Sequence, residues 1–337
     1  MRIVRLLAVG LLVLTPSLAW ADDTLVKFGG GAASTTIGSY SLGGVAASTT
    51  IGSYNPFDVL IESAVGQNKT PFTPLSFWNF GEGWLEPWIP PPGGERRLER
   101  GGWVNTFNGF FLREFDPTFT FNAGTSGNRD EYVGAASLFV PLSRRLEISL
   151  FVPFVDSLER TRRSRSATSF GDLVVTPQVM LEETETLSLS ALLAIRTPTG
   201  EAKTGNGMTV LSPAIAVYQD LGAHWQWRGA VGMDFATHGD FTSHRAEGPD
   251  QIFDLNLAAG NTLTSEEATP FGGLTPYLSA NLNQDLGSGS NFTNVSLTPG
   301  VRFFLGLHAY SITGVIIPVT KPRAFIPGVT TVLNIFW

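Results

Sequence analysis

The chain has 337 residues, of which only 15% are charged, and its net charge at pH 7 is −7. A soluble enzyme of this length normally carries about 25% charged residues, so this composition, with 37 glycines and 24 phenylalanines, favours strands whose outer face meets lipid. The acidic balance argues against nucleic-acid binding, and the absence of cysteine excludes disulfides, thiolate metal sites and cysteine nucleophiles.

Residues 1–21 have the pattern of a bacterial signal peptide. Arg2 and Arg5 form a basic start, Leu6 to Leu14 is apolar, and Ala19 to Ala21 fits a small-residue cleavage site. The apolar run is too short to span a membrane, and no later stretch approaches the roughly 20 apolar residues of a transmembrane helix. The sequence therefore predicts an exported protein whose mature chain begins after residue 21.

Residues 22–54 form a low-complexity segment rich in glycine, serine and threonine. The nonapeptide AASTTIGSY at residues 32–40 recurs unchanged at residues 46–54. Two copies are too few for a solenoid, which needs at least three stacked repeats. We interpret the repeat as a local duplication within a flexible segment.

Residues 55–100 precede the predicted strands and combine seven prolines with many aromatic residues. The aromatic residues are Phe57, Phe72, Phe77, Trp78, Phe80, Trp84 and Trp88. Two interpretations remain open: the segment folds against the barrel mouth or into its lumen, or it is an interfacial anchor at the inner rim, where tryptophan is favoured. Glu95 to Arg100 is a charged hinge before the first strand.

A period-two pattern of apolar and polar residues recurs from Gly102 to the C-terminus and predicts an all-β fold. Runs of about ten residues match a tilted transmembrane strand better than a soluble strand, which leaves a secreted β-sandwich as the less favoured alternative. We therefore expect a transmembrane antiparallel up-and-down β-barrel over residues 101–337. Its expected twelve strands are residues 102–113, 131–141, 144–155, 171–182, 186–197, 209–219, 223–235, 251–260, 271–284, 292–304, 307–319 and 328–337.

The expected connections alternate between short and long, as periplasmic turns and outer loops do in such barrels. Short turns are expected near residues 142–143, 183–185, 220–222 and 305–306, and longer loops at 116–130, 156–170, 198–208, 236–250 and 320–327. The ten residues 261–270 depart from this alternation. Six prolines fall inside the expected strands and predict bulges there, because proline cannot donate to the ladder. They are Pro153, Pro177, Pro213, Pro276, Pro299 and Pro318.

The last strand ends the chain on an aromatic residue. Val329, Thr331, Leu333, Ile335 and Trp337 share one face, and the neighbouring Phe336 is the one large apolar residue on the other. This strand resembles the closing strand of a bacterial outer-membrane barrel. The resemblance implies that Phe336 and Trp337 form the C-terminal signal read by the barrel-assembly machinery, and that the protein resides in the outer membrane.

Five short motifs in a fixed order carry a family resemblance. They are GDLVVTPQVML at residues 171–181, RTPTGE at 196–201, LSP at 211–213, QDLG at 219–222 and LTPGVR at 297–302. The chain resembles the outer-membrane transporter family named for the meta-pathway of phenol degradation (MetA-like), a relative of the FadL-like hydrophobic-compound channels. The resemblance covers roughly residues 101–337. It implies a channel for passive uptake or efflux of small solutes, hydrophobic or aromatic ones included, with no catalytic residues and no cofactor.

Seven charged residues occupy the polar face of the expected strands and are candidates to line the lumen. They are Glu147, Asp172, Arg196, Arg228, Asp234, Asp254 and Arg302. Buried charges need partners or water, so these residues form either an ion-pair network or a polar constriction that selects solutes. A twelve-stranded barrel is intermediate in width between filled and open barrels, which predicts a narrow or partly plugged pore.

One basic run, RTRRSR, lies on an expected outer loop. Its arginines are Arg160, Arg162, Arg163 and Arg165. Clustered arginines bind phosphate groups, so they are candidates to contact lipopolysaccharide, with a solvated loop as the other interpretation.

An outer-membrane lipid hydrolase and a structural or adhesive surface barrel are the alternatives to a channel. His238, Asp240, Ser243 and His244 share one expected outer loop. Neighbours on a loop do not supply the geometry of a serine nucleophile, its histidine base and an orienting group. No spacing typical of metal ligands occurs, so no metal site is predicted.

Overall fold

The computed structural model describes residues 55–66, 71–92, 100–125, 129–159, 167–201, 205, 207–237, 251–286, 293–306, 308–320 and 326–337. The predicted signal peptide and the duplicated segment lie outside these residues, as do the arginine run and the loop carrying Ser243 and His244. Within this part of the chain, no helix is long and apolar enough to cross a membrane.

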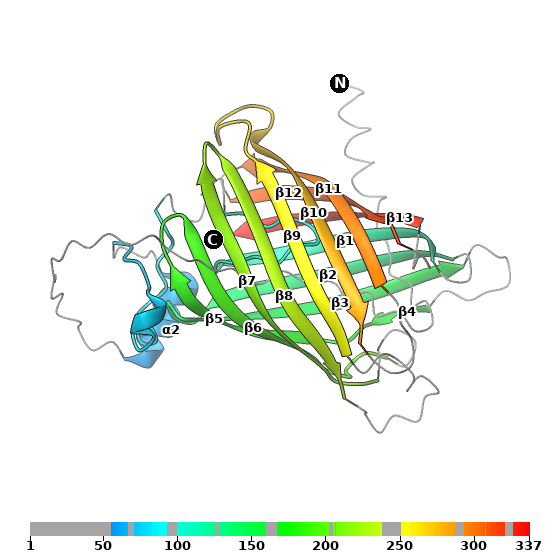
Figure 1. Ribbon diagram of the computed structural model, residues 1–337, viewed down its shortest axis with the longest axis horizontal. Coiled ribbons are helices and arrows are strands. Elements are labelled where there is room, and N and C mark those ends of the chain that lie inside the picture. The colour runs from blue at the N-terminus through cyan, green and yellow to red at the C-terminus, as the bar shows by residue number, and fades with distance from the viewer. Residues whose placement is uncertain are drawn as a thin grey trace.

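Thirteen antiparallel strands form one continuous sheet (Figure 1). They are β1 (Glu114–Thr125), β2 (Arg129–Pro141), β3 (Leu146–Glu159), β4 (Ala167–Phe170), β5 (Val174–Glu183), β6 (Leu187–Arg196), β7 (Val210–Gly222), β8 (Trp225–Ala236), β9 (Gln251–Asn261), β10 (Gly272–Asp285), β11 (Thr293–Gly306), β12 (Ala309–Pro318) and β13 (Ile326–Phe336). Twelve of them form the wall of the barrel, and the short β4 pairs with the end of β3.

The first and last strands close the barrel. Glu114 on β1 lies opposite Phe336 on β13, and Thr120 lies opposite Thr330. On the other side β2 pairs with β3, which pairs with β5, so the ring is complete and presents no free edge. The predicted twelve-stranded antiparallel barrel is confirmed.

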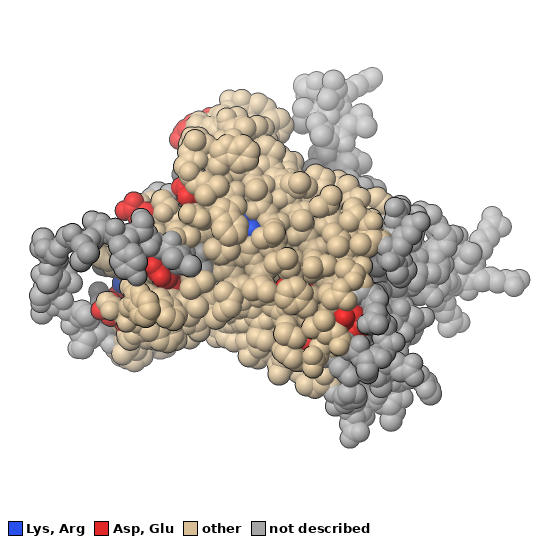
Figure 2. Space-filling model, in the orientation of Figure 1, with Lys and Arg blue, Asp and Glu red and all other residues tan. Residues whose placement is uncertain are grey.

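Alternate residues of each strand face inward and outward. On β6, Ser188 and Ser190 are completely buried inside the barrel, while Leu189 and Leu193 lie on the outer face. In Figure 2 the strand wall is almost free of charge, and the visible acidic residues gather toward the two ends. An apolar outer band with a polar interior is the pattern of a transmembrane barrel.

The predicted first strand and first loop are wrong. The wall begins at Glu114 instead of Gly102, and most of the expected loop 116–130 is strand β1. The connection from β1 to β2 is therefore only residues 126–128. Residues 102–113 alternate like a strand, but their apolar side chains are buried inside the barrel, and a period of two cannot distinguish that environment from lipid.

The expected bulges are wrong at five of the six prolines, and the pairing shifts only opposite Pro153. Pro213 pairs with Leu193, and Pro299 pairs with Leu278, without any change of register. Register is likewise continuous through Pro177, Pro276 and Pro318. Opposite Pro153 it shifts by one residue, because Phe151 pairs with Val174 whereas Phe154 pairs with Phe170. Shifts occur elsewhere, for example between Asp220 and Gly222 near the end of β7. Each proline lacks one ladder donor, and at the other five positions the surrounding closed sheet holds the register without a bulge.

A cap covers the end of the barrel where β13 finishes, called here the C-terminal end. The cap contains helix α2 (Pro56–Val65), the single turn η1 (Phe77–Asn79) and residues 71–92 around it. Asn55 caps α2 by accepting from the Phe57 N–H, and Pro56 begins the helix. Leu75 exchanges two backbone hydrogen bonds with Glu183 at the end of β5, which fixes the cap to the barrel wall.

Candidate functional site

Residues 100–113, called here the inserted segment, enter the barrel from its C-terminal end and return to β1. Arg100 marks the entry, where its Nη1 lies 2.8 Å from Glu183 Oε1 and both side chains are buried. Arg113 marks the return, and its Nη1 donates to the Gly66 carbonyl at 2.7 Å. Between them, Trp103, Val104 and Phe110 are buried inside the barrel. The inserted segment therefore fills this end of the lumen.

Two tyrosines of the barrel wall hold the backbone of the inserted segment. Tyr277 Oη on β10 accepts from the Val104 N–H at 3.0 Å, and Tyr310 Oη on β12 accepts from the Gly102 N–H at 2.9 Å. The Tyr310 hydroxyl donates in turn to Glu114 at 2.8 Å. Buried backbone donors must be paired, so these tyrosines make an irregular chain segment compatible with the barrel interior.

The Trp103 side chain stacks on the Tyr277 ring, with centroids 5.0 Å apart and planes only 1° from parallel. Glycines on the neighbouring strands make room for this pair. A methyl group added at Gly260 would lie 2.8 Å from Trp103, and one added at Gly300 would overlap the Tyr277 ring. The small inward residues of β9 and β11 are therefore part of the seat for the inserted segment.

Three of the predicted lumen residues contact the inserted segment. Arg228 donates to Asn108 Oδ1 at 2.8 Å and to the Gly101 carbonyl, and its guanidinium lies 4.1 Å from the Trp103 ring centroid. Glu147 accepts from the Leu112 N–H at 2.7 Å. Arg302 donates to Thr275 and leaves no space for a side chain at Gly101. These charges fasten the segment to the wall.

The other four predicted residues interact within the wall. Asp172 accepts from the Gly200 N–H at 2.9 Å and interacts electrostatically with Arg196 at the end of the barrel opposite the cap. Asp234 accepts from Ser212 on the neighbouring strand. Asp254 accepts from Asn283, and it is the one member of the seven that also lines the cavity described next.

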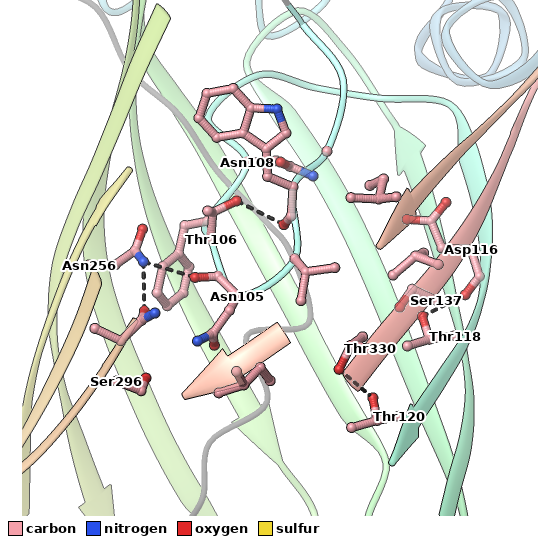
Figure 3. Close-up of a pocket in the computed structure, with 18 of the residues that line it drawn as sticks. Asn105, Thr106, Asn108, Asp116, Thr118, Thr120, Ser137, Asn256, Ser296 and Thr330 are labelled. Atoms are coloured by element: carbon pink, nitrogen blue, oxygen red, sulfur yellow. Dashed lines mark hydrogen bonds between the residues drawn. The ribbon is translucent and has the colours of Figure 1, made fainter. Parts of the chain in front are cut away.

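A cavity of about 140 Å³ lies between the inserted segment and the barrel wall (Figure 3). Asn256 Nδ2 on the wall donates to the Asn105 carbonyl of the segment at 2.9 Å and to Asn281 Oδ1 at 2.6 Å. The lining residues are 102–108 of the segment and Asp116, Thr118, Thr120, Asn122, Ser137, Phe151, Asp254, Leu255, Asn256, Asn281, Asn283, Asn294, Ser296, Ile312, Ile316, Thr330, Val332 and Asn334 of the wall.

The lining combines amides and hydroxyls with a few apolar side chains. Its two charged residues, Asp116 and Asp254, are both acidic, and no lysine, arginine or histidine is among the described residues that line it. Phe107, Phe151 and Ile316 contribute apolar surface. Such a site can hydrogen-bond a small molecule while it packs against an apolar body.

Sequence reasoning missed most of this site because it selected charged residues alone. Tyr277, Tyr310 and Asn256 are uncharged, and single amides or tyrosines on a polar strand face carry little signal. A detectable signal does exist in the amides at alternating inward positions of neighbouring strands, at Asn256 on β9, Asn281 and Asn283 on β10 and Asn294 on β11.

Arg145, in the turn between β2 and β3, joins the cap to the barrel. Its guanidinium donates to five backbone carbonyls, those of Ser76, Asn79, Glu82, Met180 and Leu181. Burial lowers the pKa of Arg145, and the neighbouring Arg144 lowers it further. The planar fork of donors suits arginine for such a junction better than lysine.

The residues proposed for other chemistry are placed as follows. Arg160, Arg162, Arg163 and Arg165 lie outside the described residues, as do His238, Asp240, Ser243 and His244. Of the other two histidines, His224 lies in the turn between β7 and β8, and the His308 ring lies 5.9 Å from Phe336. Among the residues that the structure describes, no group of three or more acidic, histidine or cysteine side chains could hold a metal ion.

The side chains of the last two residues, Phe336 and Trp337, point in opposite directions. Phe336 is buried inside the barrel beside Tyr310, and Trp337 lies on the outside with its Nε1 donating to the Ala64 carbonyl of α2 at 3.0 Å. Both rings therefore lie at the C-terminal end of the barrel, next to the cap.

The sequence profile of a family described as "Putative MetA-pathway of phenol degradation" matches residues 104–306, which is more than half of the chain. The chain belongs to this family. No curated protein matches it significantly. The family match spans all but the first four residues of the inserted segment and the wall from β1 to β11, and so includes most of the cavity lining.

Two solved structures are similar to this chain, and the first of them shares its barrel fold. The COG4313 outer membrane channel from Pseudomonas putida F1 aligns with a TM-score of 0.53 at 14% identity, over 66% of this chain and 94% of that one. The KdgM porin aligns with a TM-score of 0.45 at 7% identity, over 66% and 99% of the two chains. At 14% identity the first match establishes a common fold.

Proposed function

We propose that this protein is a passive outer-membrane channel for small solutes, hydrophobic and aromatic ones included. The observation that carries the proposal is the cavity of about 140 Å³ inside a closed barrel whose outer face is apolar. A closed barrel isolates a polar interior from lipid, and an interior site with apolar and hydrogen-bonding groups suits transient binding of a passing solute.

The inserted segment restricts what can pass. It fills the C-terminal end of the lumen, so a solute that leaves the cavity toward this end requires the segment to yield. A cavity of about 150 Å³ is enough to hold one benzene ring, which sets the expected solute size. The phenol-degradation description of the family fits a single-ring aromatic solute.

The orientation and partners of the channel follow from the same proposal. Residues 1–21 direct export, and Phe336 and Trp337 form the signal for the barrel-assembly machinery. The C-terminal end with its cap then faces the periplasm, because four of the five strand connections at this end are turns of two to four residues. Arg160, Arg162, Arg163 and Arg165, on the connection at the other end, are candidates to contact lipopolysaccharide phosphates.

The test is permeation through the purified full-length barrel. Liposomes that contain the protein should swell in isosmotic solutions of small neutral solutes, whereas protein-free liposomes should not, and planar bilayers should show discrete current steps. Flat current traces together with an absence of swelling would contradict a channel and favour a structural or adhesive role. Esterase activity that Ser243→Ala abolishes would instead favour the lipid hydrolase.

A further inference from the structure

Of the seven buried side-chain atoms in the described lining that have no hydrogen-bond partner, five are acceptor oxygens. The other two are the donors Trp103 Nε1 and Asn281 Nδ2. Asn256 donates with its Nδ2 to the Asn105 carbonyl and to Asn281 Oδ1, so its own Oδ1 remains, and that buried atom has no partner. Because a backbone carbonyl can only accept, the orientation of the Asn256 amide is determined by its surroundings. The free end of this side chain is therefore an acceptor.

The opposite side of the barrel, formed by β1 and β13, also presents buried oxygens without hydrogen-bond partners. Asn334 Nδ2 on β13 donates to Glu114 Oε2 at 3.3 Å, which leaves the buried Asn334 Oδ1 without a partner. Next to it on β1, Asp116 is only 6% exposed, and its Oδ1 has no hydrogen-bond partner. Native proteins rarely leave buried polar atoms unpaired, so these oxygens indicate a place where a donor from outside the chain binds.

The ionisable side chains of the lining also favour a ligand that donates hydrogen bonds. Asp116 on β1 and Asp254 on β9 stand in facing walls, and no cationic side chain is among the described residues that line the space between them. The arginines of the interior are engaged with the inserted segment: Arg228 binds Gly101 and Asn108 and lies over Trp103. A carboxylate-bearing solute would meet two acidic side chains and no compensating cation among these residues.

We propose that the cavity is a binding site for a small neutral or cationic molecule that carries O–H or N–H donors on an apolar, single-ring body, and that it rejects organic anions. Donors of the ligand pair with the free oxygens of Asn256, Asn334 and Asp116. The apolar body packs against Phe107, Phe151 and other apolar lining residues. The proposal rests on the channel function only for its transport consequence, because binding can be measured separately.

Binding of three matched probes to the detergent-solubilised full chain tests the proposal by calorimetry. Resorcinol has two O–H donors, 1,3-dimethoxybenzene has the same ring without donors, and benzoate is an anion. We expect resorcinol to bind at least about tenfold more tightly than the other two, since each comparison removes at least one hydrogen bond to a buried acceptor. Equal binding of the three probes, or no binding of resorcinol, would overturn the proposal.

Substitutions locate the site. Asn256→Leu removes an acceptor from one wall, and Asp116→Asn replaces a carboxyl oxygen of the facing wall with an NH2 donor. Each should weaken resorcinol binding about tenfold. Asp234→Asn is the matched control, since Asp234 is a buried inward acid outside the described cavity lining. An equal loss of binding in the control variant would contradict the assignment of resorcinol binding to this cavity.

Flux through proteoliposomes separates this inference from the channel proposal. Faster entry of resorcinol than of benzoate, with the difference reduced in Asp116→Asn, supports both the channel function and the selectivity of the cavity. Selective binding without any flux contradicts the channel and leaves the binding site supported. Flux of both solutes at similar rates in the unaltered protein contradicts the selectivity proposed here and leaves the channel intact.

Discussion

At the scale of single residues, the site depends on glycines, which leave space in the wall, as much as on the side chains that occupy this space. Gly300 and Gly260 face inward, and the stacked pair of Trp103 and Tyr277 occupies the space that their side chains would need. Tyr277 in turn positions Val104 by accepting its N–H. A substitution of one glycine therefore affects the wall and the inserted segment together, because interiors pack at high density.

Gly300→Ala should lower the free energy of unfolding by about 1–3 kcal/mol, since the added methyl group overlaps the Tyr277 ring. Urea unfolding in lipid vesicles, followed by tryptophan fluorescence, measures the change. Gly306→Ala is the control on the same strand, because nothing lies within 4 Å of a methyl group there. A similar loss of stability in both variants would contradict a specific clash at Gly300.

At the scale of elements, the inserted segment and the cap are held by arginines with different tasks. Arg228 binds the segment inside the barrel, through two hydrogen bonds and the Trp103 ring. Arg145 binds the cap outside it, through five backbone carbonyls contributed by the cap and by β5. The segment and the cap can therefore be loosened separately.

Arg228→Met should raise channel conductance. Each lost hydrogen bond to the guanidinium is worth about 1.5–3 kcal/mol, so the population with the segment displaced should rise by a factor on the order of ten or more. Single-channel recording measures the open fraction and the conductance. Arg196→Met is the matched control, an inward arginine on β6 that interacts with Asp172 at the opposite end of the barrel. Unchanged conductance in Arg228→Met would show that the segment does not limit passage.

Arg145→Lys should release the cap while the barrel stays folded. A lysine has three donors and no planar fork, so it cannot replace five contacts, and the junction should lose about 1–3 kcal/mol. Limited chymotrypsin digestion should cut faster at Phe77 and Trp78, which are already exposed in the cap. Cleavage at the same rate as in the unaltered protein would mean that other contacts, such as the Leu75–Glu183 pairing and the Arg144–Glu86 ion pair, hold the cap without Arg145.

At the scale of the whole molecule, closure between β1 and β13 pairs every strand of the ring on both sides. A closed ring satisfies the backbone in lipid, and the alternation then assigns every second residue to the acyl chains. Leu257 illustrates this assignment, since it is 49% exposed at the middle of β9 while Asn256 beside it lines the cavity.

Leu257→Arg should destabilise the barrel in a bilayer by about 2–4 kcal/mol, because it places a charge near the membrane centre. Leu263→Arg is the control, since Leu263 is exposed in the connection between β9 and β10, outside the strands. Urea unfolding in vesicles compares the two. Equal stability of the variants would argue that β9 does not face lipid.

The sequence by itself determined the alternation of the wall. The face of β6 that carries Leu189 and Leu193 was predictable, as was the burial of Arg228 and Arg302, because a period of two assigns residues to faces without knowledge of the neighbours. The family resemblance was also readable from short motifs, and the match over residues 104–306 confirms it.

Only the tertiary structure decided that residues 102–113 lie inside the barrel, that β1 begins at Glu114, and that Arg228 fastens a segment instead of lining an open pore. The position of the cavity depends on contacts between residues as distant in sequence as Asn105 and Asn256. The physical reason is that local periodicity records whether a side chain is sheltered from water. Lipid, a packed lumen and a neighbouring strand all provide that shelter, and only the closed three-dimensional arrangement distinguishes them.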